Sequence, residues 1–132
     1  MILLDANILV SAMLGTRVPR VLAQVRARGV TLAVTAPQIV EAARVLIEKI
    51  GMQEAEAHHA LAAVISLLTP IGEQVYAPME ASARRRLHDR AQSDWPLLAA
   101  ALASSGAIWS EDRDFFGVGV PVWSSRNMQY AE

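Results

Sequence analysis

Two kinds of hydrophobic pattern alternate along the chain. Short runs rich in Ile, Val and Leu stand between polar residues, Gly or Pro, a pattern that is typical of buried β-strands. The longer segments between them repeat hydrophobic residues every three or four positions, as amphipathic helices do. The predicted strands are Ile2–Leu4, Thr31–Val34, Thr69–Ile71, Ala107–Trp109 and Val120–Trp123.

Helices are predicted in the intervals between these strands. Gly15, Gly29 and Gly51 mark three of their ends, because Gly interrupts helices readily. Thr35, with Gln38 three residues later, has the spacing of a capping box, in which the two side chains bond to each other's backbone N–H groups. The predicted helices are Ala6–Leu14, Pro19–Arg28, a helix from Thr35 to about Ile50, Glu54–Leu68, Pro78–Leu87, and a helix from Ser93 or Asp94 to about Ala103.

This alternation of strands and helices predicts an α/β fold. Parallel strands need long crossover connections, and right-handed crossovers place helices on both faces of the sheet. The expected architecture is therefore a three-layer α/β/α sandwich with a mainly parallel sheet. The length of 132 residues favours a single domain over residues 1–132.

The composition excludes several classes of protein. A hydrophobic content of 53% excludes an intrinsically disordered chain. The absence of cysteine excludes disulfides and thiolate-bound zinc. No stretch reaches the roughly 18–20 apolar residues that a membrane-spanning helix needs, and no signal peptide is visible. We therefore expect a cytoplasmic protein without a membrane partner.

Four carboxylates stand at informative positions. Asp5 directly follows the first strand, and Asp112 comes shortly after the fourth. Glu41 falls in the second turn of the helix after the second strand, and Asp94 opens a helix. Ligands of open parallel sheets bind beyond the carboxyl ends of the strands, so these side chains are predicted to converge there. A cluster of oxygen ligands favours Mg²⁺ or Mn²⁺ over zinc or copper.

Each acidic residue also has a simpler interpretation. Asp5 and Asp94 are suited to cap the helices that follow them. Glu41 has the pattern of an ordinary surface residue of a helix, and Asp112 and Asp114 are suited to turns. Only the joint pattern favours a site over these separate structural roles.

Four segments occur in a characteristic order: ILLDAN at 2–7, IVEA at 39–42, DWPLLAAAL at 94–102 and IWSEDRDFFG at 108–117. Together they resemble the PIN-domain family, especially the VapC-like toxins of toxin–antitoxin pairs, over essentially the whole chain. The resemblance implies a sheet of strand order 3-2-1-4-5. It also implies a metal-dependent endoribonuclease, in which one or two Mg²⁺ or Mn²⁺ ions activate the water that hydrolyses an RNA phosphodiester bond.

The resemblance also implies roles for individual residues, carried over by motif. The catalytic quartet would be Asp5, Glu41, Asp94 and Asp112. Three of these, Asp5, Asp94 and Asp112, match the metal ligands, and Glu41 is a further candidate ligand.

Three neighbouring residues have supporting roles by the same resemblance. Ser110 matches a position that supports the site through hydrogen bonds, and Asn7 falls where a small polar residue aids the first aspartate. Asp114 is a candidate for an additional ligand or for the cap of a short turn.

The expected partners follow from the same resemblance. They are an RNA substrate, a cognate antitoxin and a second copy of the chain in a homodimer. A second interpretation is a binding module with little catalysis, which acts mainly through an antitoxin or regulatory complex.

The basic residues leave two alternatives open. Arg84, Arg85 and Arg86, together with Arg113, are candidates for contacts with RNA phosphates. Alternatively, the run at 84–86 is a solvated helix end, where arginine is favourable in any case. The formal charge of −1 includes the four candidate carboxylates, so the rest of the chain carries +3. The total charge therefore does not exclude a nucleic-acid partner.

Overall fold

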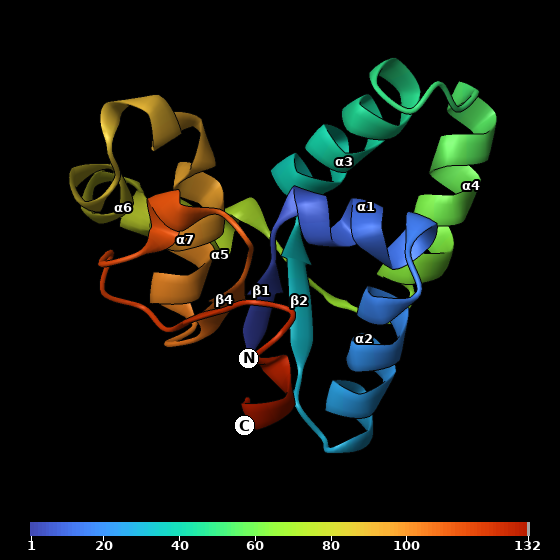
Figure 1. Ribbon diagram of the computed structural model, residues 1–132. Coiled ribbons are helices and arrows are strands. Elements are labelled where there is room, and N and C mark those ends of the chain that lie inside the picture. Colours follow the sequence, from blue (N-terminus) through green and yellow to red (C-terminus); the bar gives the residue numbers. More distant parts are fainter. Residues whose placement is uncertain (132) are drawn as a thin grey trace.

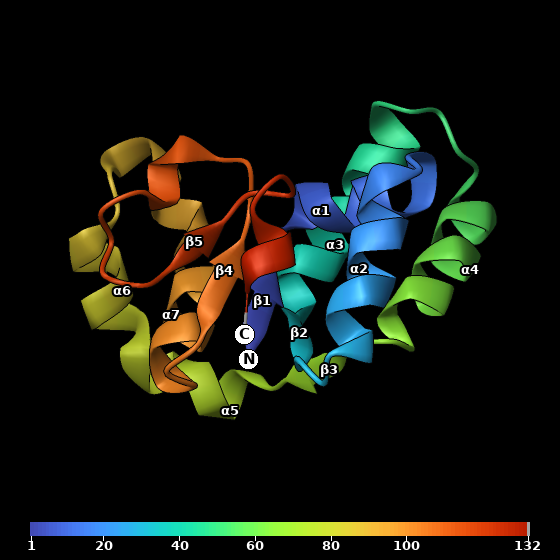
Figure 2. The same cartoon turned by 60° about the horizontal axis from the view of Figure 1, so that its bottom comes forward.

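Five parallel strands form one sheet in the order β3-β2-β1-β4-β5 (Figures 1 and 2). The computed structural model describes residues 1–131. The predicted three-layer α/β/α fold and its strand order are confirmed. The strands are β1 (Ile2–Leu4), β2 (Leu32–Thr35), β3 (Thr69–Ile71), β4 (Ala107–Trp109) and β5 (Val122–Trp123).

Helices cover both faces of this sheet. In Figure 1 the first four helices lie to the right of the strands and the last three to the left. They are α1 (Ala6–Leu14), α2 (Arg17–Ala27), α3 (Ala36–Glu48), α4 (Glu54–Ile65), α5 (Glu73–Tyr76), α6 (Glu80–Arg86) and α7 (Trp95–Ala103). Short 3₁₀ turns are formed by Ala77–Met79, Asp89–Asp94, Arg113–Phe115 and Met128–Tyr130.

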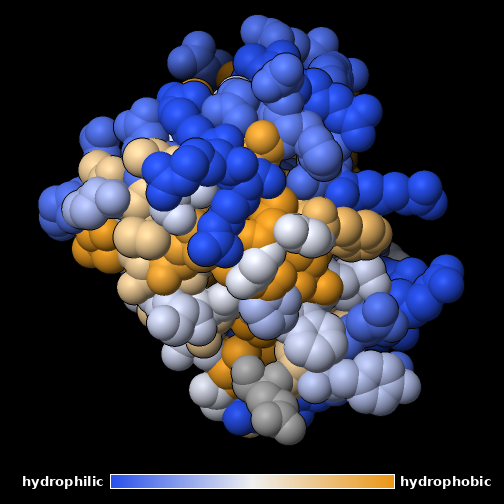
Figure 3. Space-filling model, turned by 90° about the vertical axis from the view of Figure 1, so that its left-hand side faces the viewer, coloured by the Kyte–Doolittle hydropathy of each residue, from blue (hydrophilic) through white to orange (hydrophobic). Residues whose placement is uncertain are grey.

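The sheet separates two hydrophobic cores. Successive side chains of a strand point to opposite faces, and Ile2 and Leu4 accordingly belong to the core beneath α1–α4, whereas Leu3 belongs to the core beneath α5–α7. Because both faces of β1, β2 and β4 are buried, these three strands contain runs of hydrophobic residues rather than alternating ones. Several side chains packed against the second core are only half-buried. Figure 3, which views this side, shows apolar side chains gathered in the middle of the face, below a polar upper part.

Several predicted ends of elements differ from the observed ones. Helices α3 and α4 end at Glu48 and Ile65, two and three residues before the predicted ends. The predicted helix over 78–87 is divided, because a 3₁₀ turn containing Pro78 precedes α6. Strand β5 begins only after Pro121, which has no N–H group to donate to the ladder.

The predicted capping box at the start of α3 is wrong. Thr35 makes no cap hydrogen bond with its side chain, and its buried Oγ1 has no partner among residues 1–131. Gln38 is 4% exposed, and its Oε1 accepts a hydrogen bond from the backbone N–H of Ala6 at 2.8 Å. Gln38 therefore caps α1, a different helix, and connects the start of α3 to the end of β1.

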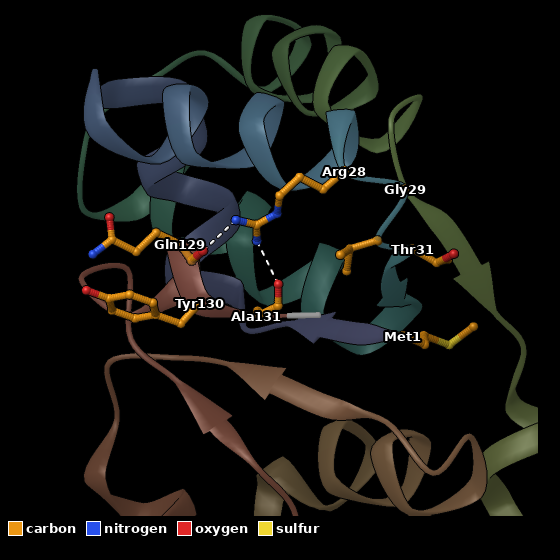
Figure 4. A pocket seen from close by; sticks show the side chains of 8 residues that line it. Met1, Arg28, Gly29, Thr31, Gln129, Tyr130 and Ala131 are labelled. Carbon is orange, nitrogen blue, oxygen red and sulfur yellow. Dashed lines mark hydrogen bonds between the residues drawn. The ribbon is translucent and has the colours of Figure 1, made fainter.

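Arg28 anchors the C-terminal segment at the edge of the sheet where β1 and β2 begin. Its guanidinium donates to the carbonyl oxygens of Gln129 and Ala131, as Figure 4 shows, and to that of Met128. Arg28, Gln129, Ala131 and Met1 line a cavity of about 600 Å³ beside the amino-terminal ends of β1 and β2. The N-terminus and the last described residues thus lie side by side, at the bottom of the view in Figure 1.

No single helix among residues 1–131 has both the length and the hydropathy needed to span a membrane. Helices α1 and α2 meet such a criterion only when taken together, and a bend of 108° separates them.

The capping role of Gln38 predicts opposite effects for two neighbouring substitutions. Gln38→Leu should lower the free energy of unfolding by about 1–3 kcal/mol, because the buried N–H of Ala6 loses its acceptor. Thr35→Val should leave it unchanged or raise it by up to about 1 kcal/mol, because it removes a buried hydroxyl without a partner. Urea denaturation measures both values, and equal losses in the two variants would contradict the assignment.

Candidate functional site

A cavity of about 480 Å³ lies at the carboxyl edge of the sheet, at the upper end in Figure 1. The structure brings the side chains of all four predicted carboxylates to this cavity: Asp5, Glu41, Asp94 and Asp112. Strands β1 and β4 are neighbours at the point where the strand order reverses, which is where open α/β sheets bind ligands. Asn7, Gln38 and Arg44 also line the cavity.

Ser110 connects two of these aspartates. Its hydroxyl donates to Oδ2 of Asp5 at 2.5 Å and accepts from the backbone N–H of Asp112 at 2.9 Å. Ser110 is 1% exposed, so both hydrogen bonds are shielded from water. The Ser110 side chain therefore connects the end of β1 to the loop after β4.

The Asp5 carboxylate is buried at the end of β1. Burial raises the pKa of Asp5 above its usual value, and the nearby charge of Asp112 raises it further. The hydrogen bond from Ser110 and the backbone N–H groups of Asn7 and Ala6 act in the opposite direction. Asp5 occupies the N-cap position of α1, but it forms no hydrogen bond with regular cap geometry. Its carboxylate is therefore turned toward Ser110 and the cavity.

The pKa of Asp94 is shifted strongly by its place in the cavity. It stands at the N-cap position of α7 and likewise forms no side-chain cap bond. Burial raises the pKa of Asp94 to about 6, and the charges of Asp5, Asp112, Asp114 and Glu41 contribute in the same direction. At neutral pH this group is thus an ionised carboxylate among like charges.

Glu41 differs from the three aspartates. Arg44 binds both of its carboxylate oxygens, at 2.6 and 3.0 Å, and also binds Glu48. This hydrogen bonding by Arg44 lowers the pKa of Glu41. Glu41 therefore already has a cationic partner, and it lies on the exposed side of the cavity.

Asp114 does not line the cavity. Its Oδ1 accepts hydrogen bonds from the guanidinium of Arg90 at 2.5 and 2.8 Å, and its backbone N–H donates to Asp112. Asp114 thus helps to position the loop that carries Asp112.

The predicted basic run at 84–86 is divided among different contacts. Arg84 pairs with Glu80 and lies over the ring of Trp95 at 5.4 Å. Arg86 donates to the carbonyl oxygen of Val118, whereas Arg85 is exposed. Arg113, the remaining candidate for RNA contacts, lines a separate cavity beside the acidic one.

The donor set of the cavity fits a divalent cation in its chemistry. Asp5, Asp94 and Asp112 offer only oxygen ligands, which Mg²⁺ and Mn²⁺ prefer. No cationic side chain of residues 1–131 forms an ion pair with Asp5, Asp94 or Asp112. Among residues 1–131, however, no three Asp, Glu or His side chains are close enough together to hold an ion as they stand. Like charges repel one another, and a cation bound between these carboxylates would offset that repulsion.

Three polar residues contact the site or its loop without having been predicted there from the sequence: Arg44, Gln38 and Arg90. The spacing from Glu41 to Arg44 is a signal for an ion pair on a helix. Gln38 carries only the misleading signal of a local cap. Arg90 and Asp114 are 24 residues apart, and no local pattern indicates their contact.

Comparisons with known proteins agree with this fold. The family model of the PIN domain matches residues 3–132. VapBC2 from Rickettsia felis, solved bound to a DNA fragment from their promoter, is 15% identical with a TM-score of 0.70, and the match covers 94% of this chain and 98% of that one. FitAcB from Neisseria gonorrhoeae is 20% identical with a TM-score of 0.60, covering 96% of this chain and 99% of that one.

A third solved structure, VapBC-1 from nontypeable Haemophilus influenzae, is 16% identical with a TM-score of 0.63, and the match covers 96% of this chain and 99% of that one. At these identities the likenesses show the fold. No curated protein matches the sequence. The match of the family model over nearly all of its residues shows that this chain belongs to the PIN domain family.

Proposed function

We propose that this protein is a metal-dependent endoribonuclease and the toxin of a type II toxin–antitoxin pair. PIN domains are generally nucleases. The observation that carries the proposal for this chain is the arrangement of Asp5, Asp94 and Asp112 around one cavity at the switch point of the sheet. Asp5, Asp94 and Asp112 pair with no cationic side chain among residues 1–131, so the cavity attracts cations. A divalent cation can activate the water that hydrolyses a phosphodiester.

Asp5, Asp94 and Asp112 would hold the ion, with Glu41 as a further ligand when it leaves Arg44. A Mg²⁺ or Mn²⁺ ion held there would acidify a water molecule and offset charge on the reacting phosphate. Ser110 keeps the Asp5 carboxylate and the loop of Asp112 in a fixed relation. Asp114 remains a weaker candidate as a ligand, because Arg90 occupies it.

The proposed partners rest on the resemblance to VapC-like toxins. VapBC2, which has this fold, was solved bound to a DNA fragment from their promoter, and FitAcB and VapBC-1 have the same fold. We propose that a cognate antitoxin binds this chain and that two copies form a dimer.

One observation favours the second interpretation, a PIN-fold binding module with little catalysis. The carboxylates stand apart from one another in the described residues, and Glu41 is occupied by Arg44. If no cation draws them together, the protein would act only through its complexes. Metal binding and RNA cleavage therefore separate the two functions.

Replacing single site aspartates should abolish cleavage. Asp5→Asn and Asp94→Asn should each lower the rate of RNA cleavage in Mn²⁺ by about 100-fold or more, because each removes charge that stabilises the bound ion. The rate is measured by gel analysis of a labelled RNA, and EDTA should stop cleavage by the unaltered protein until Mn²⁺ is restored.

Asp89→Asn is the matched control, since Asp89 is exposed and lies outside the cavity. It should cleave at the unaltered rate. Equal rates in all variants would show that the cavity is not the catalytic site. Absence of both cleavage and Mn²⁺ binding in the unaltered protein would favour the binding module.

The raised pKa of Asp94 predicts a stability that depends on pH. Because the folded protein binds this proton more tightly than the unfolded chain does, ionised Asp94 destabilises the metal-free fold at pH values above about 6. In EDTA at pH 7.5, Asp94→Asn should therefore raise the free energy of unfolding by about 1–2 kcal/mol. The gain should shrink as the pH falls through 6 and be nearly absent at pH 4.

Urea denaturation across this pH range measures the effect. Mn²⁺ should stabilise the unaltered protein and leave Asp94→Asn unchanged, because the ion replaces the proton as the neutralising charge. If the difference in the free energy of unfolding between the two proteins did not vary with pH, the ionised Asp94 carboxylate could not be its cause.

A further inference from the structure

A second, larger cavity lies beside the acidic one. Its volume is about 760 Å³, and it is formed by the loop after β4, the start of α2 and the segment after β5. Ser110 lines this second cavity, while its hydroxyl binds Asp5 and Asp112 of the first. The neighbouring residues Asp112 and Arg113 line different cavities. The two cavities are therefore adjacent and share one loop.

The second cavity has the opposite charge. Three arginines line it: Arg17, Arg113 and Arg126. No carboxylate of residues 1–131 forms an ion pair with any of them, and their side chains make no hydrogen bonds within that range. The single acidic residue of the lining, Glu111, accepts a hydrogen bond from the backbone N–H of Ser125 at 2.6 Å. The guanidinium groups are thus available to an anionic ligand.

The remaining lining suits a chain of phosphates. Hydroxyl groups of Ser11, Thr16 and Ser124 are present as donors. Helix α2 begins here, its N-cap residue Thr16 forms no side-chain cap bond, and its first turn contains no acidic residue. The positive end of the helix therefore adds to the charge of the arginines.

One exposed aromatic ring stands at this cavity. Phe116 also lines it and is 61% exposed, whereas its neighbour Phe115 is 1% exposed and fills the core. An exposed phenyl ring gains nothing from the fold, and beside phosphate-binding groups it offers a surface on which a base can stack. The combination of a basic groove and an aromatic ring is typical of sites for single-stranded nucleic acid.

We infer that this arginine cavity holds the RNA strand on one side of the phosphodiester that lies at the acidic cavity. Arg17, Arg113 and Arg126 bind phosphates of that strand, and Phe116 stacks on one of its bases. The inference rests on the proposed ribonuclease function and adds to it the path of the substrate. In place of the run at 84–86, it assigns the contacts with RNA phosphates to three arginines that lie far apart in the sequence.

Binding of RNA without cleavage tests the inference. The probe is an unstructured, fluorescein-labelled 12-nucleotide RNA, and anisotropy is measured in EDTA, where no cleavage is expected. The groove variant replaces Arg17, Arg113 and Arg126 by Ala. The control variant replaces Arg20, Arg26 and Lys49 by Ala; these residues are exposed and lie outside the cavity, and their replacement removes the same charge.

The dependence on salt gives the expected size of the effect. Loss of three phosphate contacts should lower the slope of log Kd against log salt by about 2. The factor by which Kd rises between 50 and 200 mM salt should then be roughly 20-fold smaller for the groove variant than for the unaltered protein. The control variant loses the same net charge but no phosphate contact. Its slope should therefore stay close to that of the unaltered protein.

Phe116 supplies an independent measurement. Phe116→Ala should raise the Kd for RNA by about fivefold or more, and Phe116→Trp should restore it, because stacking needs only an aromatic face. Tyr130→Ala is the matched control, since Tyr130 is 69% exposed and lies at the opposite edge of the sheet. It should leave the Kd unchanged.

The outcomes distinguish the inference from the proposed function. Equal losses in the groove and control variants would overturn the inference, even if the unaltered protein cleaves RNA in Mn²⁺. Normal RNA binding by the groove variant, together with lost binding of an octaglutamate peptide, would also overturn it and would identify the cavity as a docking site for an acidic protein segment. Specific loss of RNA binding in the groove variant supports the inference, and absence of cleavage by the unaltered protein would then count against the catalytic proposal alone.

Discussion

The hydroxyl group of Ser110 connects the two strands on which the candidate site depends. It donates to Asp5 at the end of β1 and accepts from Asp112 after β4, which makes partners of residues 105 positions apart. These strands are neighbours only because the chain, having built β2 and β3 on one side of β1, returns to place β4 on the other. That reversal also separates the helices that cover the two faces and leaves a crevice at the carboxyl edge. The site is therefore a product of topology, and a single buried hydroxyl keeps its two halves in register.

The residues of the acidic cavity are arranged at a cost to the stability of the fold. Asp5 and Asp94 occupy the positions at which an aspartate would normally cap a helix, yet neither forms a regular cap bond. Gln38 takes over this task for α1 from another helix, and Asp94 remains ionised among like charges. Local propensity and tertiary placement disagree at these residues, whereas they agree through most of the sheet. Such disagreements concentrate where a protein binds or reacts, because charges held ready for a ligand are costly to the fold without it.

The limits of prediction from the sequence follow from the range of the interactions involved. The run Ile2–Leu4 is predictable as a strand because both its faces are buried, and the positions of Asp5 and Asp112 relative to strand ends follow at once. The ends of α3 and α4 are less predictable, because last turns depend on a few hydrogen bonds. The spacing from Thr35 to Gln38 predicts the wrong partner for Gln38, because this signal is local whereas Ala6 lies 32 residues away. No local sequence pattern indicates the pairing of Arg90 with Asp114, which are 24 residues apart.

The total charge of −1 conceals two opposed regions that share one loop. Asp112 faces a cavity lined by carboxylates, and the next residue, Arg113, faces one lined by arginines. A polyanion approaching the acidic cavity alone would be repelled, and a cation approaching the arginine cavity alone would be repelled as well. In the proposed function, the two adjacent fields would orient a strand so that some of its phosphates meet arginines while another is brought toward the carboxylates, where a cation would reverse the local sign. For a protein of this kind the arrangement of charge, and not its sum, determines whether RNA can bind.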